Sequence, residues 1–519
     1  MRNIDRLRFL GLALLPFAIL AEFSFGQTEA FGQTEAVAKD LPKPQPGPVG
    51  AAGSKRLSEH LEAVRAEFGL PAMAAAVIVD GKPILVAAIG ERKMGSGVRV
   101  KSGDLFHLGS CTKAMTAFLI ERLVDQRRLT YQARIQDLCP RLRRSMHREH
   151  ASLTLEHCLT HRAGLVGMDG TFEGIPKNSL KLTGARARFD YAQRMLHRKP
   201  LSTVGTKFGY SNVGYTVAAL AAEEKMRQPW ETLMSEQIYL PLDMRSVGYG
   251  AAGSARKVDQ PWPHEYENEK HKPVPPSLKA DNAEIIGPAA RIHCSMSDWA
   301  KFAAEVLRAS PASSDSKNSL LSPQGRKRLL TPPTEGGNYS GGWFVSHNRV
   351  YGNVLSHDGS DMLNQALAFL VPARQFGVLV ATNSGHPLRK RACEFVRTRI
   401  AADWLFGGMD HVDLSYEPYR ANDARTWIAR LQHNGLLERS KRYLTPELYE
   451  FFSSKDGQEL CSQLAKQGKL QQIEFLGRNR ENDVEFSVYE ARFANSVWRV
   501  EYAAERTKRL TTHLKFKAQ

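Results

Sequence analysis

The sequence predicts an α+β fold in which an antiparallel sheet is flanked by helices and a helical lobe is inserted between its strands. Two short runs of apolar residues, 72–79 and 84–89, lie early in the chain and are typical of strands. The long middle, from residue 110 to about 307, mostly has the apolar spacing of helices, and strand-like runs return at 342–383. Early and late strands separated by helices favour one sheet closed by both ends of the unit.

Two segments precede this unit. Residues 1–26 combine Arg2, Arg6 and Arg8 with a short apolar run and then small residues, which is the pattern of a secretory signal peptide. The apolar run is too short for a comfortable membrane span, so we expect export to the periplasm or the medium. An uncleaved N-terminal membrane anchor is the alternative. Residues 27–54 are rich in proline and are predicted to be a disordered linker.

The globular unit is predicted to extend from residue 55 to residue 408. A helix is expected over residues 57–68, and the pair Asp80-Gly81 between the two early runs predicts a β-hairpin. A closing helix is expected over residues 388–405. With 42% hydrophobic residues, the 519-residue chain can form the core of one large domain and one small domain.

Ser110 and Lys113 form a Ser-x-x-Lys motif where a strand-like run ends and a long apolar helix begins. Their spacing places both side chains on one face of the first helical turn. A serine hydroxyl becomes a nucleophile only with an adjacent base and a stabilised oxyanion, and a lysine one turn away meets the first need. Further copies at Ser254 and Ser314 lie in polar segments that indicate surface loops. An N-cap serine beside a solvated lysine is the structural alternative for Ser110.

Two later motifs favour the catalytic interpretation. Tyr-Ser-Asn at residues 210–212 stands directly before an apolar helical run, whereas the copies of Tyr-x-Asn at Tyr266 and Tyr351 do not. His-Asp-Gly-Ser at residues 357–360 lies between two strand-like runs. Each motif is weak by itself, but three in this order, each in a suitable local context, indicate one active site.

On these motifs the chain resembles the serine β-lactamase-like family, in the branch of class C β-lactamases, penicillin-binding proteins and esterases. The signatures of that family are Ser-x-x-Lys, Tyr-x-Asn, and Lys-Thr-Gly or His-x-Gly. The resemblance covers roughly residues 55–405 and includes Leu-Thr-His-Arg-Ala-Gly-Leu at 159–165. It implies a β-lactamase/transpeptidase-like fold, with the active site between two lobes.

The resemblance also implies a role for each matched residue. Ser110 attacks a carbonyl carbon and forms an acyl-enzyme, while Lys113 and Tyr210 share the proton transfers. A neighbouring cation is expected to lower the pKa of Tyr210 from its ordinary value of about 10. The implied substrate-binding residues are Asn212, His357, Gly359 and Ser360, and the implied oxyanion hole consists of the backbone N–H groups of Ser110 and Ser360.

His357 limits the expected substrate, which is a small molecule or a peptide. Dedicated β-lactamases of the family usually carry lysine at this position, whereas histidine is charged only in part at neutral pH. We therefore expect an ester, an amide or a D-amino-acid peptide as substrate. A true class C β-lactamase, or a penicillin-binding protein acting on β-lactams or peptidoglycan peptides, is the alternative. A catalytically idle binding or sensor module is an alternative of another class.

Residues 409–519 lie outside the matched motifs. Helical runs followed by four strand-like runs predict a small α+β accessory domain, which weakly resembles NTF2-like domains. A packing or substrate-presentation module without chemistry is the simpler interpretation.

Neither a metal nor a cofactor is predicted. The six cysteines show no close pairs or metal-type spacing, and His107, His161 and His293 are scattered. Cys111, next to the predicted nucleophile, is interpreted as a small buried residue. The net charge of +17 makes an anionic cell-envelope polymer a candidate partner. The basic clusters lack interleaved aromatic residues, so nucleic acid is not expected as a partner.

Overall fold

The computed structural model describes residues 47–518 apart from several short segments. These segments are 169, 172–174, 176–182, 278–279, 311–312, 314, 334–336, 349–351, 407–426, 429–430, 433–443, 469, 482–483 and 505–510. The predicted signal peptide and most of the predicted linker lie outside the described residues. Within the described part of the chain, no helix combines the length and the apolar character needed to cross a membrane.

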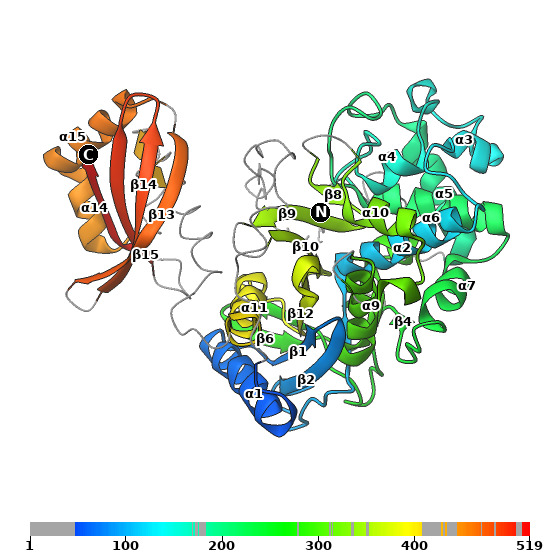
Figure 1. Cartoon of the computed structure of the whole chain (residues 1–519), viewed down its shortest axis with the longest axis horizontal. Helices are drawn as coiled ribbons and strands as arrows, with labels where there is room; N and C mark the ends of the chain where they lie inside the picture. Colours follow the sequence, from blue (N-terminus) through cyan, green and yellow to red (C-terminus); the bar gives the residue numbers. More distant parts are fainter. Residues whose placement is uncertain are drawn as a thin grey trace, which may run out of the picture.

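The larger unit is built around a seven-stranded antiparallel sheet (Figure 1). The strand order is β2-β1-β12-β11-β10-β9-β8, so the early hairpin pairs with the last strand of the unit. This arrangement confirms the predicted α+β fold and its sheet made from both ends of the unit. The strands are β1 (Ala72–Val79), β2 (Lys82–Gly90), β8 (Tyr339–Ser340), β9 (Trp343–Asn348), β10 (Gly352–Ser360), β11 (Gln365–Val371) and β12 (Phe376–Thr382).

Both faces of this sheet pack against other parts of the unit. Side chains alternate between the two faces along each strand, so one strand contributes to two cores. In β1, the odd-numbered residues from Met73 to Val77 share a core with α1 (Gly50–Glu67) and α11 (Arg389–Phe406). The even-numbered residues from Ala74 to Ile78 belong to the core of the helical lobe. The central strands are therefore apolar on both sides, which explains their nearly continuous hydrophobic sequence.

Helix α1 begins at Gly50, inside the segment that the sequence predicts to be a linker. Trp404 of α11 donates a hydrogen bond from Nε1 to the Pro48 carbonyl oxygen at 2.9 Å, and a Cβ on Gly53 would lie only 2.2 Å from the same oxygen. The start of α1 is thus fixed by contacts with a helix some 350 residues away. Local composition does not reveal such contacts.

The middle of the chain forms the helical lobe on one face of the sheet, as predicted. Helix α6 is buried along most of its length, so its sequence is apolar all round. The lobe also contains strands of two to four residues, which are too short to show a periodic pattern. Its helices are α2 (Thr112–Asp125), α3 (Ile135–Leu138), α4 (Leu155–Leu159), α5 (Gly184–His197), α6 (Asn212–Met226), α7 (Trp230–Met234), α8 (Gly287–Ala290), α9 (Met296–Arg308) and α10 (Pro323–Leu330), and its strands are β3 (Leu105–His107), β4 (Gly248–Tyr249), β5 (His264–Glu267), β6 (Lys270–Pro273) and β7 (Ile292–Ser295).

The C-terminal unit contains helices followed by an antiparallel sheet of order β13-β14-β15-β16. It has a core of its own, which includes Trp427, Tyr489 and Trp498. The predicted order of helices and strands agrees with this unit, while the NTF2-like resemblance stays a prediction. Its elements are α14 (Pro446–Ser453), α15 (Lys455–Lys466), β13 (Leu470–Glu481), β14 (Val484–Phe493), β15 (Val497–Ala504) and β16 (Thr511–Ala518). All six cysteines of the chain are buried and free.

Candidate active site

Ser110 lies in a single 3-10 turn, Gly109–Cys111, that joins β3 to α2. Gly109 has a φ of 50°, and a Cβ at this residue would lie 2.3 Å from the backbone nitrogen of Ser360. A Cβ on Gly359 would lie 2.6 Å from the backbone nitrogen of Ser110. The two glycines therefore allow this turn and the end of β10 to approach closely. The backbone N–H groups of the implied oxyanion hole thus come from two adjacent segments.

Lys113 is fully buried next to Ser110. Its Nζ lies 3.1 Å from the Ser110 Oγ, 2.7 Å from the Asn212 Oδ1 and 3.1 Å from the Ala289 carbonyl oxygen. All three partners are uncharged oxygens, so they do not compensate for the loss of water around an ammonium group. Burial accordingly lowers the pKa of Lys113 to about 7. At neutral pH, a large fraction of the Lys113 side chains is therefore the neutral amine.

Tyr210 lies directly before α6, whose N-cap is Ser211. The Lys113 Nζ lies 4.7 Å from the centroid of the Tyr210 ring, and the His161 ring packs against the same phenol at 4.3 Å between centroids. Burial raises the pKa of Tyr210 well above its ordinary value, and a hydrogen bond with Ser110 opposes this rise only in part. The expectation of a lowered pKa is wrong for this site, because loss of solvent around the phenol outweighs the neighbouring lysine. A raised pKa favours the protonated phenol at neutral pH.

His357 lies on β10 and is buried among aromatic side chains. Its Nδ1 lies 2.6 Å from the Asp358 carbonyl oxygen, which can only accept, and its Nε2 lies 3.1 Å from the Tyr339 hydroxyl. These contacts fit a neutral ring that donates from Nδ1 and accepts at Nε2. Burial, supported by the charge of Lys113, lowers the pKa of His357 to about 4. The expectation that His357 is partly charged at neutral pH is therefore wrong, because a pKa of about 4 makes the imidazole neutral.

Contacts join all of the predicted site residues into one cluster. Asn212 is the first residue of α6, and its Oδ1 accepts a hydrogen bond from the Lys113 Nζ. The Ser360 hydroxyl donates to the Asn364 carbonyl oxygen at 2.7 Å and accepts from the Met362 N–H at 3.0 Å and from Arg389 at 3.3 Å. These bonds fix the end of β10 beside Ser110.

Sequence reasoning gave no role to three residues that contact this cluster. The Ala289 carbonyl accepts from Lys113, and a backbone group leaves no side-chain signal in the sequence. The Tyr339 hydroxyl contacts His357, and its ring packs edge-on against Phe344 at 4.9 Å. His161 accepts a hydrogen bond at Nδ1 from the Ser211 N–H at 3.0 Å. The matched segment at 159–165 was the available signal for this histidine.

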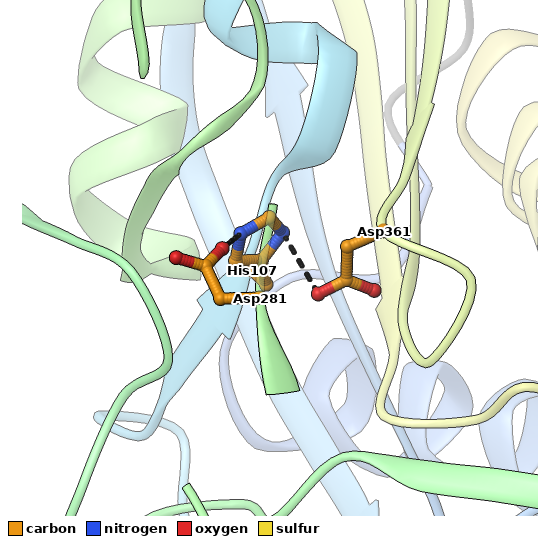
Figure 2. Close-up of side chains that lie close together, drawn as sticks. All are labelled: His107, Asp281 and Asp361. Atoms are coloured by element: carbon orange, nitrogen blue, oxygen red, sulfur yellow. Dashed lines mark hydrogen bonds and ion pairs between the residues drawn. The ribbon is translucent and has the colours of Figure 1, made fainter. Parts of the chain in front are cut away.

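One group of potential metal ligands is found among the described residues: His107, Asp281 and Asp361 (Figure 2). The His107 Nε2 lies 2.9 Å from Asp281, whose other oxygen accepts from Arg291. The Gly109 N–H donates to the His107 Nδ1 at 3.1 Å. Hydrogen bonds and an ion pair thus account for the cluster without a metal ion, and the predicted absence of a metal stays a prediction.

Comparison with curated proteins identifies relatives of this chain. The profile of the Beta-lactamase family matches residues 57–403. The unguisins hydrolase ungD of Aspergillus violaceofuscus is 28% identical over 341 residues, which cover 61% of this chain and 58% of the relative. Penicillin-binding protein 4 of Amycolatopsis lactamdurans is 28% identical over 186 residues, 36% of this chain and 46% of the relative. The chain thus spans about half the length of the curated relatives it matches.

Solved structures share the fold. The octameric penicillin-binding protein homologue from Pyrococcus abyssi matches with a TM-score of 0.56 at 16% identity, over 89% of this chain and 95% of that chain. The D-stereospecific amidohydrolase from Streptomyces matches with a TM-score of 0.51 at 18% identity, over 68% and 98%. At these identities the likeness supports the fold. Because the family profile covers well over half of the sequence, this chain belongs to the β-lactamase family.

Proposed function

We propose that this protein is an exported hydrolase that forms an acyl-enzyme on Ser110 and cleaves an ester, an amide or a D-amino-acid peptide. The observation that carries the proposal is the distance of 3.1 Å between the Ser110 Oγ and the Nζ of Lys113. A lysine with a pKa of about 7 is a base matched to neutral pH, which is the condition for efficient proton transfer.

The neutral amine of Lys113 fits its three partners in one way. It donates its two N–H groups to Asn212 and to the Ala289 carbonyl, and its lone pair then accepts from the Ser110 hydroxyl. The Ser110 Oγ attacks the substrate carbonyl carbon while its proton passes to the Lys113 Nζ. The negative charge that develops on the carbonyl oxygen is stabilised by the backbone N–H groups of Ser110 and Ser360.

Tyr210 serves as the acid of the reaction. Its raised pKa keeps the phenol protonated, so it can donate a proton to the leaving oxygen or nitrogen as the acyl-enzyme forms. The ammonium of Lys113, beside the Tyr210 ring, returns a proton to this phenol. For hydrolysis of the acyl-enzyme, the same pair takes a proton from the attacking water and returns one to the Ser110 Oγ.

The neutral His357 favours substrates without a carboxylate at the strand side of the site. Its ring is buried and hydrogen-bonded to Tyr339, so it offers no charge-assisted contact there. The names of two similar proteins, an unguisins hydrolase and a D-stereospecific amidohydrolase, support an amide or peptide substrate. The second candidate substrates are β-lactams and peptidoglycan peptides. The name of the relative penicillin-binding protein 4 favours this class.

The specificity proposal is tested with His357→Lys. We expect the wild type to hydrolyse a short-chain p-nitrophenyl ester or a D-aminoacyl p-nitroanilide with a higher kcat/KM than nitrocefin. His357→Lys should shift the ratio toward nitrocefin by about tenfold, which corresponds to about 1.4 kcal/mol from a new charged contact. His357→Gln, which adds no charge, should not shift it. Efficient nitrocefin hydrolysis by the wild type would contradict the proposal.

Export is tested at the N-terminus of the mature chain. We expect removal of residues 1–26, because basic residues followed by a short apolar run are a signal for export and cleavage. N-terminal sequencing of protein from the periplasm or medium should find a start near Gln27. A mature chain that begins at Met1 and sediments with membranes would support the anchor instead. The full chain has a net charge of +17, and residues 1–26 carry only one unit of that excess, so the exported chain stays strongly basic and favours contact with anionic envelope polymers.

A further inference from the structure

His107 lies at the end of β3, three residues before Ser110, and takes no part in the proton transfers proposed above. It is buried, with 6% of the residue exposed, and both of its ring nitrogens have polar neighbours. Nε2 lies 2.9 Å from the Asp281 Oδ1, and Nδ1 accepts from the Gly109 N–H at 3.1 Å. The Asp361 Oδ2 lies 3.5 Å from the same Nδ1 (Figure 2).

These neighbours belong to the segments that bear the implied oxyanion donors. Gly109 begins the 3-10 turn that carries Ser110, and Asp361 directly follows Ser360. Asp361 is itself held in place, because its Oδ1 accepts from the N–H groups of Leu363 and Asn364 and its Oδ2 accepts from the Asn364 amide. The His107 ring thus lies between the nucleophile turn and the end of β10.

Asp281 holds the opposite edge of the His107 ring. This carboxylate accepts from the Arg291 Nε at 2.5 Å, and its side chain is almost fully buried. A carboxylate can only accept, so it requires a proton on the Nε2 of His107. With that proton in place, Nδ1 is free to accept from Gly109, which is the arrangement that the distances fit.

A second proton on His107 changes the neighbour that Nδ1 can bind. A protonated Nδ1 no longer accepts from the Gly109 N–H, but it can donate to Asp361. Burial by itself would lower the pKa of His107, but the carboxylates of Asp361 and Asp281 outweigh burial and raise it. The other charged or titratable groups that face these three side chains are Arg291, His293 and Arg389, and Glu284 pairs with Arg291.

We propose that His107 is a positioning residue that holds the Ser110 turn through the Gly109 N–H, and that protonation of its Nδ1 transfers this contact to Asp361 and slows turnover. The inference rests on the proposed function of Ser110. Catalysis through an oxyanion hole depends on donors within hydrogen-bond reach of the developing charge, and a displacement of about 1 Å costs on the order of 10²-fold in rate.

Two substitutions of His107 each keep one of the two hydrogen bonds of its ring. The Oδ1 of His107→Asn can accept from Gly109 in place of Nδ1, whereas the Nε2 of His107→Gln can donate to Asp281 but leaves the Gly109 N–H without its acceptor. At pH 8 we expect His107→Asn to keep kcat within about threefold of wild type. His107→Gln should lose about 10- to 10²-fold in kcat, with little change in KM. His293→Asn, in the neighbouring strand β7, is the control for loss of a partly buried histidine ring.

The pH profile of kcat distinguishes positioning from a loss of stability. As the pH falls, the wild-type kcat should decline in two protonation steps, one on Lys113 and one on His107. The kcat of His107→Asn should decline in a single step, on Lys113. Equal losses of kcat in the Asn and Gln variants, in proportion to their melting temperatures, would overturn the proposal. The proposal would also be overturned if the pH profile of kcat were the same in His107→Asn as in the wild type.

A direct measurement of the ring is independent of activity. In ¹⁵N-histidine-labelled wild-type protein, we expect the Nδ1 of His107 to be unprotonated at pH 8 and protonated at acidic pH, with the Gly109 N–H resonance shifting at the same midpoint. An Nδ1 that carries a proton at pH 8 would contradict the inference. If Ser110 fails to label with a fluorophosphonate while this titration is seen, the proposed function fails and the proton-dependent contact of His107 stands.

Discussion

Ser110→Ala is expected to abolish covalent labelling by a fluorophosphonate and to lower kcat for an ester substrate by about 10⁵-fold or more. Without the Oγ there is no acyl-enzyme, and the remaining site can only bind the substrate and stabilise an oxyanion during attack by water. Peptide mass spectrometry after brief exposure of the wild type should find the adduct on the peptide that contains Ser110. The variant should fold, because it removes only one of three oxygens around the Lys113 Nζ.

The chain contains a matched control for this experiment. Ser254 belongs to a second Ser-x-x-Lys copy, but it lies in a turn in which its backbone N–H donates to Asp259 and its Oγ accepts from the Arg256 N–H. Ser254→Ala should keep wild-type kcat and labelling. An adduct on any residue other than Ser110, or full activity of Ser110→Ala, would refute the assignment of the nucleophile.

The parts of the site that sequence could predict are those encoded in local context. Ser110 and Lys113 share one helical turn, so their spacing alone predicts that they meet. Tyr210 was distinguished from other copies of its motif by the helix that follows it, and the motif at His357 was supported by the strand-like runs on either side. The β-hairpin at Asp80-Gly81 is likewise local, and its two strands form as predicted.

The parts that could not be predicted depend on distant segments. Ala289 binds Lys113 across 176 residues through a carbonyl oxygen, which every residue possesses. The pKa directions of Tyr210 and His357 follow from burial, and burial results from packing of the strands β8 to β10 against the helical lobe. The sequence shows which titratable groups are present, but only the packed structure decides whether water reaches them.

Lys113→Met is expected to lower kcat/KM for an ester by at least about 10³-fold, because it removes the base and leaves a side chain of similar length. Lys113→Arg should lose a similar factor, since a guanidinium stays charged and cannot accept the Ser110 proton. Tyr210→Phe should cost about 10²-fold or more. The double variant Lys113→Met/Tyr210→Phe should be only slightly slower than Lys113→Met, because residues that act as one unit are not additive. Tyr266→Phe, in the hairpin strand β5, is the control for the loss of a phenol hydroxyl.

The pH dependence of kcat/KM identifies which of the two groups is the base. The kcat/KM of an enzyme reports the ionisation of its free form. Burial lowers the pKa of Lys113 to about 7, and the base acts only after it has lost its proton, so activity should rise as the pH increases through about 7. If a Tyr210 phenolate were the base, its raised pKa would move this rise to well above pH 10. A rise only in that alkaline range, or wild-type activity in Lys113→Arg, would show that Lys113 holds the site in place and that another group takes the proton of Ser110.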